Sequence, residues 1–182
     1  AFAADEPVSI DVRHADGDHW HIERGPNAGD KWKLADLKPG EKLAENTVVS
    51  IAAAAGGLDL AEVFARDAQR EAKALAKPTV ITTVTRDGLT YTLKVGDEGG
   101  GNRLAVGTIQ GKLPAARKPV PGEKPEEATA RDKAFAERSA KTRTRLPGTE
   151  TLNQHAFLIP TSTLFDLTKK RAELLEKPPA KP

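Results

Sequence analysis

TVITTVTRDGLTYTLKVG, residues 79–96, is the stretch that decides the fold of this chain. Two runs rich in threonine and valine flank Asp87-Gly88, a dipeptide that favours a two-residue type I′ turn in a β-hairpin. Such a turn predicts three opposed pairs: Val84 with Tyr91, Thr82 with Leu93 and Val80 with Val95. The face with these pairs is largely apolar and the other is mainly threonine, so we expect one face in the core and one in solvent.

Upstream, shorter alternating runs predict a second hairpin. Apolar residues at positions 8, 10 and 12 alternate with polar ones, and positions 20 and 22 do the same. We expect a three-residue loop at Asp16-Gly17-Asp18, because it sets Val12 opposite Ile22 and keeps the apolar side chains on one face. Residues 31–34 are expected to add a short third strand, with Trp20 and Trp32 packing in the core.

Helical spacing predicts the elements that cover these strands. Apolar residues recur every three or four positions in Leu43–Ala55, and Gly56-Gly57 should end that helix. Residues 58–65 fit either a strand or a continuation of the helix. Further along we expect a helix at 67–76, strands at 104–109 and 155–160, and a closing helix capped by Thr161 or Ser162 that carries Leu164, Leu167 and Leu174.

Residues 111–150 differ from the rest in composition. Ten Lys or Arg and five Asp or Glu lie between Lys112 and Arg145, a local charge of +5 in a chain whose formal net charge is +2. The proline-rich first part predicts an extended surface segment. The second part predicts an exposed helix with Phe135 as its main apolar anchor, ended by Pro147-Gly148.

The order of elements predicts an α+β fold, with antiparallel sheets and helices packed on one face. It also suggests two related halves, residues 1–77 and 78–176, because the first half reads hairpin, strand, helix and the second reads hairpin, strand, insertion, strand, helix. The charged insertion, residues 111–150, lies in the second half. Residues 177–182 are expected to be a disordered tail.

Composition excludes several function classes. The chain has no cysteine, which rules out disulfides, thiolate metal sites and cysteine nucleophiles. It has no apolar run of about 18 residues, so we expect membrane association only through a segment outside this sequence. The glycine-rich stretch 96–102 has no phosphate-loop pattern, and neither a nucleophile elbow nor a His-Glu-x-x-His motif occurs, so we expect no enzyme.

The densest group of potential metal ligands lies around the first hairpin. His19 and His21 share a strand face, and Asp16 or Asp18 could approach them from the loop to supply a third ligand for Zn, Cu or Ni. Against this, Arg13 is expected opposite His21 and would repel a cation. Solvated hairpin residues are therefore favoured over a metal site, and no cofactor is expected.

The charged insertion offers a second candidate site. Its basic residues could bind a polyanion, but a single aromatic residue accompanies them and no known nucleic-acid module is present. We therefore expect no nucleic-acid partner. A protein partner is favoured instead, docking through Phe135, Arg131, Arg138 and Lys141.

Several stretches together resemble domain-of-unknown-function family 4340, a family of bacterial envelope-associated proteins. The resemblance covers roughly residues 8–176. It rests on these segments: DHWHIER (18–24) with KWKL (31–34), LAENTVVSIAAAAGGL (43–58), ALAKPTVITTVTRDGLTYTLKVG (74–96), HAFLIPTSTLFDLTKKRAELL (155–175), and a basic insertion (122–146) similar to one in some branches of the family.

The resemblance implies a cellular location for the domain but no particular chemical activity. Members are often encoded beside gliding-motility-type and ABC-transporter-type components, and they usually carry an N-terminal anchor with the domain outside the cytoplasm. The family has no established catalytic residues. We therefore expect a non-catalytic interaction or scaffold domain with protein partners in a periplasmic or envelope assembly; the alternative is a ligand-binding module, for a metal at the His-rich hairpin or a polyanion at the insertion.

Overall fold

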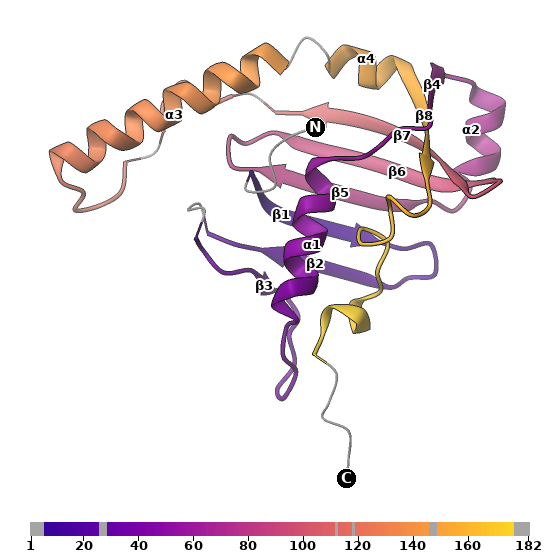
Figure 1. Cartoon of the computed structure of the whole chain (residues 1–182), viewed down its shortest axis with the longest axis horizontal. Coiled ribbons are helices and arrows are strands. Elements are labelled where there is room, and N and C mark those ends of the chain that lie inside the picture. Colours follow the sequence, from indigo (N-terminus) through magenta and orange to yellow (C-terminus); the bar gives the residue numbers. More distant parts are fainter. Residues whose placement is uncertain (1–5, 26–28, 112, 118, 146–148, 177–182) are drawn as a thin grey trace.

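A single antiparallel sheet of eight strands forms the centre of the molecule, in the order β3-β2-β1-β5-β6-β7-β8-β4 (Figure 1). The computed structural model describes residues 6–25, 29–111, 113–117, 119–145 and 149–176. The strands are β1 (Pro7–Arg13), β2 (His19–Glu23), β3 (Lys33–Leu34), β4 (Glu62–Ala65), β5 (Thr79–Thr85), β6 (Thr90–Gly99), β7 (Asn102–Gln110) and β8 (His155–Pro160). The helices are α1 (Glu45–Gly56), α2 (Ala68–Ala74), α3 (Pro125–Arg145) and α4 (Thr149–Gln154). The predicted α+β class is confirmed.

The β5–β6 hairpin forms where it is predicted, but the predicted register is wrong by one residue. Tyr91 pairs with Thr83 rather than with Val84, and the whole hairpin shifts accordingly. The loop has three residues, since the Thr85 amide donates to the Leu89 carbonyl at 2.9 Å. Gly88 has a φ of 84°, and no non-glycine residue of the described chain has a positive φ, which excludes the type I′ turn.

The β1–β2 hairpin has the predicted loop length at a different place. Its loop is residues 15–17, with Gly17 at a φ of 92°, so Val12 pairs with Trp20 and Ile10 with Ile22. The predicted partner of Val12, Ile22, is thus wrong by two residues. A register shift of two residues keeps every side chain on its predicted face. The predicted apolar face of this hairpin is therefore still correct.

Helix α1 covers one face of the sheet, and Figure 1 shows it crossing in front of the strands. Its residues Val48, Ile51 and Ala52 are at most 3% exposed and belong to the same core cluster as Trp20 and Ile22. Strand β2, which carries both partners, was predicted from alternation. The same cluster continues across the sheet to Phe157 and Ile159 of β8, so the main core lies between α1 and one whole face of the sheet.

The predicted closing helix is wrong. Residues 161–168 form successive turns, and only Arg171–Leu174 is helical, as the short 3₁₀ helix η2. The Lys169 carbonyl instead accepts hydrogen bonds from Trp20 Nε1 at 2.8 Å and from His14 Nε2 at 3.0 Å. These tertiary bonds occupy an acceptor that a continuous helix would use, while the predicted leucines are still buried: Leu164, Leu167 and Leu174.

Helix α2 packs on the opposite face of the sheet, so the helices are not confined to one side. Its Ala74 contacts a second apolar cluster that includes Leu104, Val106 and Ala156. Gly96 makes this approach possible, because a Cβ at position 96 would collide with the Ala74 carbonyl. Side-chain alternation on β6 and β7 thus supplies both faces with apolar residues.

The two proposed halves share one sheet. Strand β1 of the first half pairs with β5 of the second, and β4 of the first half pairs with β8 at the far edge. About the β1–β5 junction, three strands on each side follow in mirrored order, β3-β2-β1 and β5-β6-β7. Duplication of the halves stays a prediction.

The insertion forms α3, which Figure 1 shows extending beyond the sheet, followed by α4, which sequence reasoning did not predict. Phe135 is only partly buried, whereas Ser139 and Thr142 of α3 are 3% and 1% exposed. Thr142 is buried because its hydroxyl donates to the buried carboxylate of Asp87 in the β5–β6 loop. The expected stop at Pro147-Gly148 and the expected tail at 177–182 lie outside the described residues. No helix in the described ranges is long and apolar enough to cross a membrane.

Candidate functional site: an apolar pocket at the end of helix α1

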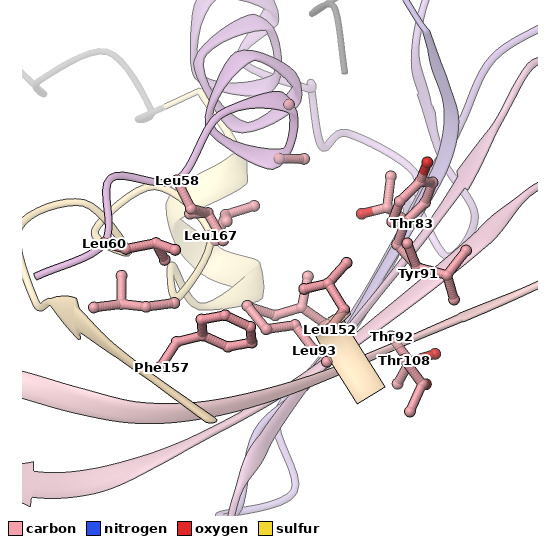
Figure 2. A pocket seen from close by; sticks show the side chains of 16 residues that line it. Leu58, Leu60, Thr83, Tyr91, Thr92, Leu93, Thr108, Leu152, Phe157 and Leu167 are labelled. Carbon is pink, nitrogen blue, oxygen red and sulfur yellow. The ribbon is translucent and has the colours of Figure 1, made fainter. Parts of the chain in front are cut away.

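A cavity of about 190 Å³ lies between the C-terminal end of α1 and strands β5, β6 and β7. Figure 2 shows Leu58 and Leu167 on one side of it and Thr83 and Tyr91 on the other. Leu152 of α4 also lines the pocket. Five separate parts of the chain therefore build this site: α1, the segment after it, the sheet, α4 and the turns that follow β8.

The pocket exists because small residues occupy its floor and roof. Gly107 of β7 lies opposite Leu93 of β6. A Cβ at position 107 would stand 3.6 Å from Leu152 and 3.7 Å from Leu93, which is ordinary contact, so the floor has room for a methyl group. Above it, α1 ends at Gly56, and the helix has no large side chain to fill the space. The hollow is thus a consequence of residue size rather than of a gap between layers.

The lining is almost entirely aliphatic or aromatic. Among the described residues that line the cavity none is Asp, Glu, Lys, Arg or His. The polar lining residues carry hydroxyl groups: Thr83, Tyr91, Thr92 and Thr108. Such a lining favours an apolar group, because a charged group would lose its hydration without gaining a partner of opposite charge.

The predicted metal ligands do not converge. His19 Nε2 lies 2.7 Å from Asp11 Oδ2, and His21 Nδ1 lies 3.5 Å from the same oxygen. Asp16 lies away from both and pairs with Lys170 Nζ at 2.6 Å. Within the described ranges no group of three or more His, Cys, Asp or Glu residues is arranged to hold a metal ion.

Register explains the arrangement around Asp11. Arg13 was expected opposite His21, but it lies opposite His19, and Asp11 takes the place opposite His21. Burial alone would raise the pKa of Asp11; hydrogen bonds with His19 and Arg13 outweigh it and lower the pKa. The hairpin therefore presents a small ion-pair network on its outer face.

The predicted partner-binding residues are only partly brought together. Arg131, Phe135 and Arg138 lie on one face of α3 by helical spacing, with Thr142 in the same row. That face is turned toward the β5–β6 loop at its Thr142 end, and Arg138 lies 5.9 Å from the Phe135 ring. Lys141 lies off this row and is exposed. These four residues therefore do not form one open surface.

Sequence reasoning missed two features of the structure. One is the buried contact of Asp87 with Thr142, for which an Asp-Gly turn gives no signal. Among the described residues, the Oδ1 atom of Asp87 and the Oγ atom of Ser139 are buried without a hydrogen-bond partner. The other is the pocket itself, for which a lone glycine inside a strand, Gly107, is the available signal.

An ion-pair cluster holds the C-terminal turns over the sheet, and with them one wall of the pocket. Arg171 pairs with Glu41 and Asp36, each at 2.7 Å. The hydrogen bond from Arg171 lowers the pKa of Glu41 to about 2, and the same contacts raise the pKa of Arg171. Asp18 adds a side-chain bond to the Arg171 amide at 3.0 Å. Leu167, on the pocket wall, lies just ahead of this cluster.

No protein-family model, no curated protein and no solved structure matches this chain. The family resemblance of residues 8–176 therefore stays a prediction. What the site can do follows from its own lining and shape, and these favour the binding of an apolar group.

Proposed function

We propose that this chain is a non-catalytic binding domain that holds a small apolar molecule in the pocket at the end of α1. The observation that carries the proposal is a cavity of about 190 Å³ whose inward side chains are apolar or hydroxyl-bearing. Removing apolar surface from water is the main source of affinity in such a site.

The size of the cavity supports a ligand of about one ring. An engineered apolar cavity of about 150 Å³ in another protein binds benzene. A cavity of about 190 Å³ accommodates a ring with one small substituent or a short aliphatic chain. Walls drawn from the sheet and from the α1 end should hold the ligand without large rearrangement.

The described lining contains no Asp, Glu, His, Lys or Arg, and this supports binding over catalysis. The carboxylates and imidazoles around Asp11 lie on the outer face of the β1–β2 hairpin, where they pair with one another. On the family resemblance alone we further propose that the domain serves an extracytoplasmic envelope assembly with protein partners.

Toluene, titrated into the full ¹⁵N-labelled chain and followed by NMR, tests the proposal. We expect saturable shifts of amide signals near the pocket, such as those of Leu93, Gly107 and Ile109, with the β2 amides unchanged. The Gly107→Val variant should lose this binding because its side chain enters the cavity. Thr82→Val, on the other face of β5, is the matched control and should bind as the parent does. Shifts that are absent, or that persist in Gly107→Val, would refute the proposal.

A further inference from the structure

The electrostatics of the pocket should make it prefer some ligands over others of equal size. This inference rests on the function proposed above. We infer that the pocket selects a neutral molecule with an apolar body and a hydrogen-bond donor, such as a short alcohol, and rejects the carboxylate of the same length. Three features of the site carry the argument: its uncharged lining, the helix end that meets it, and the hydroxyl groups on its far side.

The uncharged lining works against any ion. In the described part of the chain, no lysine, arginine or histidine side chain lines the cavity to pair with an anion. A carboxylate drawn inside would lose its hydration and meet aliphatic side chains such as Leu58, Leu93 and Leu152. That desolvation penalty is large compared with the loss for an alcohol, which needs only one or two hydrogen bonds.

The C-terminal end of α1 makes the discrimination depend on sign. Ala55 and Gly56, the last residues of this 12-residue helix, line the pocket. A helix C-terminus carries partial negative charge on its free carbonyls, and the last turn of α1 contains no basic residue to offset it. Anions are therefore repelled at this end, while hydroxyl or ammonium donors are attracted.

The α1 carbonyls can accept such a donor. Gly57, which follows the helix, is extended, with a φ of −146°. Between described residues, no main-chain amide from outside the helix donates to the carbonyls of residues 53–56. A ligand hydroxyl at this end would satisfy a carbonyl that helix geometry leaves over.

Hydroxyl groups on the other side complete the pocket. Thr83, which is 4% exposed, and Tyr91 lie across the cavity from Leu58 (Figure 2). The Thr83 hydroxyl can serve a neutral polar group as donor or acceptor. An apolar body lying between Leu58 and Leu93, with its hydroxyl toward either polar side, fits this distribution.

Three probes with one six-carbon chain test the inference: n-hexanol, hexylammonium and hexanoate, each titrated at pH 7 and followed at the pocket amides. We expect hexanol to bind at least about tenfold more tightly than hexanoate, with hexylammonium closer to hexanol. Hexanoate that binds as tightly as hexanol would overturn the inference, as would a failure of hexanol when toluene binds. A failure of all probes including toluene would overturn the proposed function as well.

A charge substitution sharpens the test. Ala55→Lys adds a cation beside the pocket at the end of α1, and we expect it to raise the ratio of hexanoate affinity to toluene affinity several-fold. Ala53→Lys carries the same charge in the same turn on an exposed position, and it should give a clearly smaller gain. Equal gains in both variants, or none in Ala55→Lys, would contradict discrimination at the pocket. Thermal unfolding of each variant confirms that it is folded.

Discussion

Helix α1 covers two regions of the same sheet face, and it fills one while leaving the other hollow. Over β1 and β2, its residues Val48 and Ile51 and the facing Trp20 are at most 1% exposed. Over β6 and β7, the end of the same helix faces Gly107 across a cavity of about 190 Å³. The layers are shared, so residue size alone separates a packed core from a binding site.

The filled region holds the hollow one open. Interiors are normally packed with few voids larger than a water molecule. Here Trp20 is fixed by its hydrogen bond to the Lys169 carbonyl, and that segment continues into the Arg171 ion-pair cluster. With α1 seated at one end and the C-terminal turns fixed beside it, the walls near Gly107 cannot collapse onto the floor without disturbing that packed end.

Trp20→Ala should have the largest effect, because it breaks the filled region. We expect the free energy of unfolding to fall by about 3–5 kcal/mol, the range for large aromatic truncations in a core. Urea unfolding followed by circular dichroism measures it. Leu60→Ala, at a residue on the pocket rim that is 46% exposed, is the comparison and should change stability far less. Similar losses in the two variants would show that the regions are not packed differently.

Gly96→Ala should come next, and it tests the other face of the sheet. The added Cβ would collide with the Ala74 carbonyl, so α2 must shift. Overpacking of this kind costs about 1–3 kcal/mol. Thermal and urea unfolding should both show the loss. An unchanged stability would mean that α2 does not sit tightly on β6.

The positions of the strands could be predicted from sequence, because alternation of apolar and polar residues depends only on the two-residue period of a strand. The predicted faces hold for β1 and β2 but not for β5, where Thr83 and Thr85, expected in solvent, are 4% and 2% exposed. The register could not be predicted, since Asp-Gly fits both a type I′ turn and the last two positions of a three-residue loop. Asp87-Gly88 and Asp16-Gly17 both adopt the second form.

The candidate site was harder to foresee than the fold. A pocket depends on which residues, distant in sequence, lie side by side in the fold. The local sequence around Gly107 or Leu152 does not indicate that both line one cavity. The closing helix failed for a related reason: the Lys169 carbonyl bonds to Trp20, 149 positions away. Long-range contacts of this kind override local propensity.

Acid titration should change the stability by a smaller amount. It tests the Arg171 ion-pair cluster next to the pocket wall. Glu41 has a pKa of about 2 in the folded chain against an ordinary value of 4.5. Above pH 4.5 its contribution to stability is complete; it declines as the pH falls and is lost as the pH passes about 2, because the unfolded chain binds the proton first.

Glu41→Gln should therefore reduce stability at pH 7 and flatten the decline below pH 4.5. Urea midpoints at several pH values between 7 and 2 measure both. Glu126→Gln, at an exposed position outside the Arg171 cluster, is the control and should keep the parent's pH profile. The assignment fails if Glu41→Gln shows the same acid sensitivity as the parent.

Gly107→Ala should change the stability least. It gives the most direct comparison of the filled and hollow regions under α1. The methyl group meets only ordinary contacts with Leu152 and Leu93, and position 107 has no positive φ. Replacing glycine under these conditions restricts the unfolded chain, so stability should stay constant or rise by about 0.4–1 kcal/mol. The substitution that damages the packed face at Gly96 is thus tolerated at Gly107.

A series of increasingly large side chains at position 107 extends this test from stability to ligand binding. From Gly to Ala to Val, urea stability should hold while toluene affinity falls at each step, because each added carbon takes volume from the cavity. Constant stability together with falling toluene affinity is expected only if the floor of the pocket is hollow. A clear loss of stability already at Gly107→Ala would mean that the floor is filled, and the two regions under α1 would then be alike.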